Sequence, residues 1–199
     1  MPRPLRTLFL IAACAISTCA AAHIGTDSGV RADIGLADGL LHPLTGLDHL
    51  AAMLAVGFWS ALTARRLWVA PLAFAAMLMV GALLGLAGIA PPAVEPMVAA
   101  SLLVLGLGVA LRTRLPAALA AAMAGLFAVF HGVAHGTELA GAANLWEPLL
   151  GMLLATALLH ATGLVLGLAL HRRSAWVPRL AGVGVAALGL TLLAQLQLA

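Results

Sequence analysis

The feature that most constrains this chain is a series of long apolar stretches separated by short breaks that carry arginines. Most of these stretches approach the roughly 20 apolar residues that an α-helix needs to cross a bilayer. Hydrophobic residues make up 63% of the 199 residues and charged residues only 9%, which leaves too little polar surface to cover a soluble globule. The sequence therefore predicts an all-α polytopic membrane protein, folded as a transmembrane helix bundle.

The apolar stretches predict six transmembrane spans within a single domain, residues 23–199. No loop between the spans is long enough to form a folded soluble module. The sequence also lacks the phosphate-binding pattern G-x-x-x-x-G-K-[ST], so nucleotide hydrolysis would require another subunit. We expect the spans near residues 45–64, 67–89, 95–111, 115–135, 148–170 and 179–198.

Residues 1–22 have the pattern of a cleavable signal peptide. Arg3 and Arg6 precede a short apolar run, and small residues up to Ala22 offer a cleavage site. Cleavage there would make His23 the first residue of the mature chain. The alternative is an uncleaved first transmembrane helix, for which the apolar run is short.

The charges predict how the bundle is oriented. By the positive-inside rule, the breaks after the first, third and fifth spans lie in the cytoplasm, because they carry most of the arginines. All seven acidic residues then fall on the outer side, together with the start of the mature chain. The arginines are spread over short loops and form no continuous basic surface, so we expect no nucleic-acid partner. The arginines of these breaks are Arg65, Arg66, Arg112, Arg114, Arg172, Arg173 and Arg179.

A polar cluster interrupts the apolar pattern at the outer end of the fourth span. His131, His135 and Glu138 are spaced i, i+4 and i+7, which places all three side chains on one face of an α-helix. Gly132 and Gly136 lie beside the histidines and leave room for a close helix or an ion. The spacing therefore predicts that a divalent cation is held between these three side chains.

A second polar cluster lies where the first span begins, at the same predicted depth. It contains His42 and the adjacent pair Asp48 and His49. Pro43 and Gly46 predict a non-helical entry to the span, which would fold His42 back toward that pair. The convergence of two such clusters at one depth predicts a shared site.

The ligand types indicate which metals this site would bind. Imidazole and carboxylate groups suit nickel, cobalt or zinc better than Cu(I), and both cysteines lie within the signal segment. Any one histidine here has an ordinary interpretation as an interfacial or capping residue, and an acid also stabilises a helix N-terminus. Ionisable groups in spans are costly and usually functional, so the set together predicts a metal site. Its members are His42, Asp48, His49, His131, His135 and Glu138, with His23 as a further candidate.

His160 lies in the middle of the fifth predicted span. With Thr156, Gly163 and Gly167 it forms one stripe of the helix. An imidazole at mid-membrane depth is a candidate point on the path of an ion or a proton. The alternative is a histidine that bonds a neighbouring helix for packing.

At these two clusters the chain resembles the HupE/UreJ family of nickel and cobalt permeases and of hydrogenase or urease accessory proteins. The likeness rests on H-P-x-x-G-x-D-H, residues 42–49, and on F-H-G-x-x-H-G-x-E, residues 130–138. It implies a secondary transporter that imports nickel or cobalt across the bacterial inner membrane, with a periplasmic mature N-terminus. The metal would be the substrate, and no prosthetic group or enzymatic activity is expected. Homo-oligomer formation and a link to hydrogenase, urease or cobalamin maturation are further expectations.

Two other functions are consistent with the same residues. The first is a membrane-embedded zinc hydrolase, in which three protein ligands hold the metal and Glu138 or Asp48 acts as a base on its water. The second is an accessory protein that binds a metal without transporting it. Because imidazole binds a metal only when neutral, we expect affinity to fall below about pH 6.5 in every case.

Overall fold

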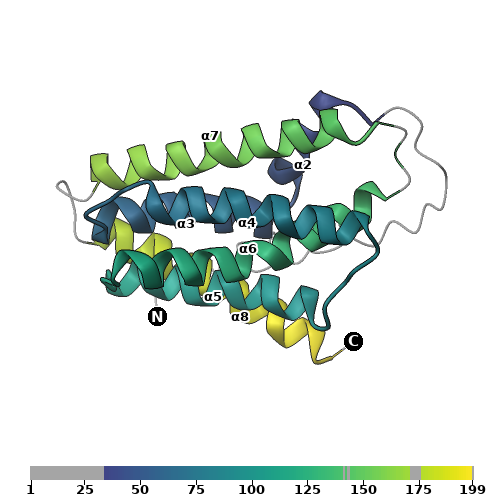
Figure 1. Ribbon diagram of the computed structural model, residues 1–199. Helices are drawn as coiled ribbons and strands as arrows, with labels where there is room; N and C mark the ends of the chain where they lie inside the picture. The colour runs from purple at the N-terminus through teal and green to yellow at the C-terminus, as the bar shows by residue number, and fades with distance from the viewer. Residues whose placement is uncertain (1–33, 141, 143, 171–175, 199) are drawn as a thin grey trace, which may run out of the picture.

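The computed structural model describes residues 34–198, apart from 141, 143 and 171–175. Within those residues the secondary structure is entirely helical, as the sequence predicts. The long helices run side by side in one bundle, and α2 lies near the end of the bundle where α7 begins (Figure 1). The helices are α2 (Leu36–Thr45), α3 (Leu47–Thr63), α4 (Val69–Leu86), α5 (Val94–Leu111), α6 (Ala117–Leu139), α7 (Trp146–Leu170) and α8 (Trp176–Leu196).

Among the described residues, five helices, α4 to α8, are long and apolar enough to cross a membrane, with lengths of 18 to 25 residues. Helix α3 is also apolar but shorter, at 17 residues. These six helices overlap the six predicted stretches, and the crossing of all six remains a prediction. Helix α6 continues past the predicted end at residue 135 to Leu139, so Glu138 is helical. The predicted signal peptide, residues 1–22, and His23 lie outside the described residues.

The predicted non-helical entry to the first span is confined to Gly46, and the prediction is wrong for Pro43. Pro43 lies inside helix α2, and the chain leaves helical geometry only at Gly46, with φ −86° and ψ 110°. Proline removes one backbone hydrogen bond from a helix. Here the ring of Pro43 is fully buried, and this packing favours the helical turn that local propensity disfavours. His42 is therefore presented from a helix rather than from a loop.

Glycines bring the helix backbones of the bundle into direct contact. A Cβ atom at Gly132 of α6 would overlap the carbonyl of Leu78 on α4, and one at Gly136 would overlap the carbonyl of Ala82. Helices α3 and α7 meet in the same way, at Gly57 and Gly163. Small residues allow such close approach between helices in lipid, where van der Waals packing replaces the hydrophobic effect.

The two ends of the bundle differ in charge. Near the end of α3, the indole N–H of Trp59 donates to the carbonyl of Thr113, 2.9 Å away, in the loop between α5 and α6. The α3–α4 loop and the α5–α6 loop therefore lie at one end, and they carry Arg65, Arg66, Arg112 and Arg114. His42 and Glu138 lie at the opposite end, where α6 finishes.

Candidate metal site

Helix α6 presents its two histidines inward. His131 and His135 lie one turn apart and are 0% and 1% exposed, so both imidazoles are inside the protein. Glu138 follows on the last turn, where its side chain is 40% exposed. The helix therefore carries an exposed carboxylate on its last turn and a buried imidazole two turns deeper.

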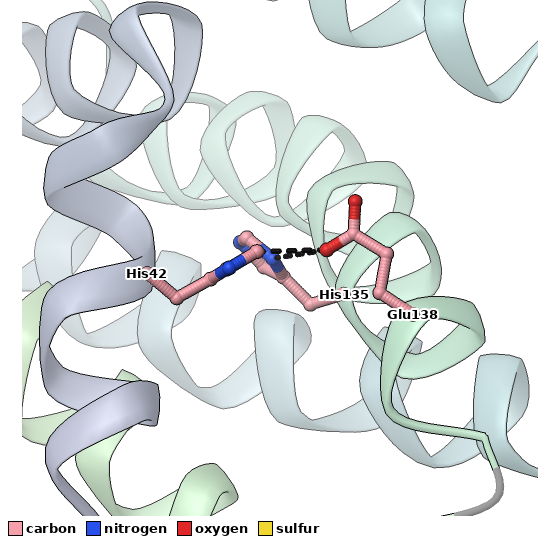
Figure 2. A group of neighbouring side chains, drawn as sticks. All are labelled: His42, His135 and Glu138. Atoms are coloured by element: carbon pink, nitrogen blue, oxygen red, sulfur yellow. Dashed lines mark ion pairs between the residues drawn. The ribbon is translucent and has the colours of Figure 1, made fainter. Parts of the chain in front are cut away.

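Helix α2 brings His42 to this carboxylate. The Nε2 atom of His42 lies 2.7 Å from Oε2 of Glu138, and Nδ1 of His135 lies 3.9 Å from the same oxygen. Figure 2 shows His42 reaching from α2 toward α6, with the lines from His42 and His135 meeting at one carboxylate oxygen of Glu138. One ligand atom from each of the three residues lies within 4.8 Å of the others, a spacing that suits a shared cation. The structure thus joins the two sequence clusters.

Asp48 and His49, at the start of α3, lie next to the group formed by His42, His135 and Glu138. The carboxylate oxygen Oδ1 of Asp48 accepts the backbone N–H of His49 and lies 2.9 Å from ring atom Nδ1. A carboxylate paired with Nδ1–H leaves the lone pair of a neutral imidazole on Nε2. The ring of His49 lies 4.2 Å from that of His135 and 4.8 Å from that of His131. The His42 ring lies 4.8 Å from that of His135, so the four histidine rings form one contiguous group.

Several imidazole nitrogens in this cluster have no hydrogen-bond partner among the described residues. They include Nδ1 of His131 and Nε2 of His135, both buried. A buried polar atom without a partner is costly and needs an explanation. A metal ion accepts the lone pair of a neutral imidazole, and carboxylates beside it balance its charge. The donor set therefore fits a divalent cation chemically.

His160 lies deeper in the bundle and outside this cluster. It is 1% exposed, and its ring centroid lies 5.2 Å from that of Phe74 on α4. The Phe74 ring in turn lies 5.6 Å from that of His131. Phe74 therefore links the cluster to His160 by an apolar contact. The predicted stripe of α7 is buried as a whole, at Thr156, His160, Gly163 and Gly167.

Two residues at the site were missed by sequence reasoning. Phe74 gives no signal, because it is one apolar residue within an apolar stretch. Ser101 of α5, whose hydroxyl lies 2.9 Å from Nε2 of His131, is the only polar side chain between Pro96 and Leu111. A lone hydroxyl in a predicted span was therefore an available clue.

The fold and the cluster define a class, multi-pass membrane proteins with histidines and carboxylates gathered inside one end of a helix bundle. The chain belongs to the HupE/UreJ family, because the family model described as HupE / UreJ protein matches residues 11–192. The chain is 42% identical over 185 residues to "Protein HupE" of Rhizobium leguminosarum bv. viciae, covering 92% of this chain and 94% of the relative. No solved structure matches the chain significantly.

Proposed function

We propose that the protein is a secondary transporter that imports nickel or cobalt across the bacterial inner membrane. The observation that carries this proposal is the meeting of His42, His135 and Glu138 from two helices, with one ligand atom of each within 4.8 Å of the others. The buried rings of His49 and His131 continue the cluster inward. Membership of the HupE/UreJ family supports the same substrate class.

The exposure of the ligands suggests an order of events. His42 and Glu138 have side chains 35% and 40% exposed, so they meet the hydrated ion first. His135 is 1% exposed, and its imidazole then replaces water in the coordination shell of the ion. The carboxylates of Glu138 and Asp48 offset the charge of the ion as it enters. The ion then passes to the rings of His49 and His131.

The charges at the ends of the bundle support an inward direction of transport. Arginine-bearing loops lie in the cytoplasm under the positive-inside rule, which puts the histidine cluster on the periplasmic side. His160 lies further along the inward path, beyond Phe74. A nickel-dependent hydrogenase or urease, or cobalamin synthesis, would receive the imported metal.

Uptake of radioactive nickel and cobalt tests the proposal, with zinc as competitor, in cells that lack their own high-affinity importers. These cells express the wild type, the double variant His131→Ala/His135→Ala, or the control His171→Ala, at equal membrane levels. The control removes one histidine that stands beside two arginines in the sequence, next to a break that is predicted to be cytoplasmic. We expect the wild type and the control to take up nickel or cobalt and the double variant to lose uptake.

Absence of uptake of all three metals by a well-folded wild type would overturn the importer. Metal that binds the wild type without crossing the membrane would then identify an accessory protein. Zinc retained through purification, together with hydrolysis of lipid amides or esters, would identify the zinc hydrolase instead.

A further inference from the structure

Ser101 contacts the deepest histidine of the cluster from a different helix. It lies on α5, is 0% exposed, and its hydroxyl oxygen lies 2.9 Å from Nε2 of His131. The same hydroxyl donates to the backbone carbonyl of Val98, 2.6 Å away. The only hydroxyl proton of Ser101 is therefore engaged in a hydrogen bond within α5.

This arrangement decides which nitrogen of His131 carries the proton. Since the hydroxyl proton of Ser101 points at Val98, the oxygen can only accept from the imidazole. Nε2 of His131 must then be the protonated nitrogen, and Nδ1 carries the lone pair. Nδ1 is buried and has no hydrogen-bond partner among the described residues. The His131 ring also lies 4.8 Å from that of His49, which places it within the cluster.

We propose that Ser101 is a positioning residue for the metal, because it holds His131 in the Nδ1-ligand tautomer and fixes the ring orientation. This proposal rests on the metal-binding function proposed above. Residues that hold a ligating imidazole by its second nitrogen typically affect metal affinity by about 10- to 100-fold. The alternative is that Ser101 only packs α5 against α6.

Cobalt binding to purified protein in detergent micelles tests the proposal, with calorimetry for affinity and the visible absorption of Co(II) for its coordination. The variant Ser101→Ala removes the acceptor, and Ser101→Thr keeps a hydroxyl. The matched control is Ser60→Ala, which removes another buried hydroxyl, 1% exposed and without a hydrogen-bond partner among the described residues. Size-exclusion profiles and thermal unfolding without metal report on the fold of each variant.

We expect Ser101→Ala to fold like the wild type, to bind Co(II) about 10- to 100-fold more weakly, and to alter its absorption spectrum. Ser101→Thr should recover most of the affinity, and Ser60→Ala should leave it unchanged. In a His131→Ala background, Ser101→Ala should cost nothing further, because its only route to the metal is then gone.

Three results would overturn the proposal. Wild-type affinity in Ser101→Ala, or an equal loss of affinity with and without His131, would exclude positioning through this histidine. Loss of folded protein in Ser101→Ala would show a packing role instead. A wild type that binds no Co(II) would overturn the proposed function itself, and this outcome is read from the wild type alone.

Discussion

At the scale of single residues, Glu138 is the group that joins the two sequence motifs. Its Oε2 atom lies 2.7 Å from His42 of α2 and 3.9 Å from His135 of its own helix. We expect Glu138→Gln to weaken cobalt binding by at least about tenfold, because a charged partner of two imidazoles is lost while the shape is kept. Calorimetric titration of the purified variant measures this change.

Glu147→Gln is the matched control for this prediction. Glu147 is another carboxylate in the described part of the chain, but its Oε1 accepts a hydrogen bond from Asn144, 2.8 Å away. It should therefore bind cobalt like the wild type. Equal losses in the two variants would mean that the general negative charge on this side attracts the ion, and that Glu138 has no special role.

His160 has a different expected effect, because it lies beyond the Phe74 ring and away from the proposed ligands of the first site. We expect His160→Ala to keep its affinity for cobalt and to lower uptake about tenfold or more, since an unpartnered charge at mid-membrane costs at least about 2.5 kcal/mol. Binding by calorimetry and uptake in cells separate the two effects. Wild-type rates of uptake in this variant would remove His160 from the path.

The sequence could predict which side chains lie together when all of them belong to one helix, because helical geometry sets their spacing. His131, His135 and Glu138 share a face because the α-helix repeats every 3.6 residues. The contacts of Ser101 and Phe74 with His131 come from α5 and α4, and they depend on how separate helices pack. No local period encodes such contacts, so the residues around the candidate ligands could not be predicted together with those ligands.

At the scale of helices, the close contact between α4 and α6 holds the histidine face in place. A Cβ atom at Gly132 would overlap the backbone of Leu78, beside the site histidine His131. We expect Gly132→Ala to lower the free energy of unfolding by about 1–3 kcal/mol, because the helices must separate to admit the methyl group. Metal affinity should fall with it. Thermal unfolding in detergent and cobalt titration measure the two changes.

Gly184→Ala of α8 supplies the control, since a Cβ atom there meets nothing within 4 Å. Alanine is the better helix former, so this variant should be as stable as the wild type or up to about 1 kcal/mol more stable. If both variants behaved alike, helix propensity rather than contact between α4 and α6 would account for the effect of Gly132→Ala.

Most of the helices could be predicted from the sequence, and the exception is helix α2. Five of the predicted stretches overlap the long apolar helices α4 to α8, because length and apolar character are local properties of the sequence. Helix α2 was not predicted, because Pro43 is locally a helix breaker. Its burial, and the crossing of α2 over α7 at Gly39 and Gly151, stabilise this short helix through tertiary contacts. Tertiary packing overrides propensity at that position.

At the scale of the whole molecule, the described bundle has imidazoles and carboxylates at one end and arginines at the other. Under the proposed orientation, an inside-negative membrane potential pulls a divalent ion from the histidine end toward the arginine end. The free energy gained is about 4.6 kcal/mol per 100 mV for two charges. The potential alone is therefore sufficient to accumulate the ion, without nucleotide hydrolysis.

Uptake into proteoliposomes tests this energy source directly. Vesicles loaded with potassium and treated with valinomycin carry an inside-negative potential when diluted into sodium buffer, with the same pH on both sides. We expect nickel or cobalt to accumulate at this potential, to equilibrate without accumulation when potassium is equal on both sides, and to be excluded when the gradient is reversed. Vesicles with the His131→Ala/His135→Ala variant control for leakage. Accumulation that requires a pH gradient and ignores the potential would contradict uniport, because two positive charges crossing alone must respond to the voltage.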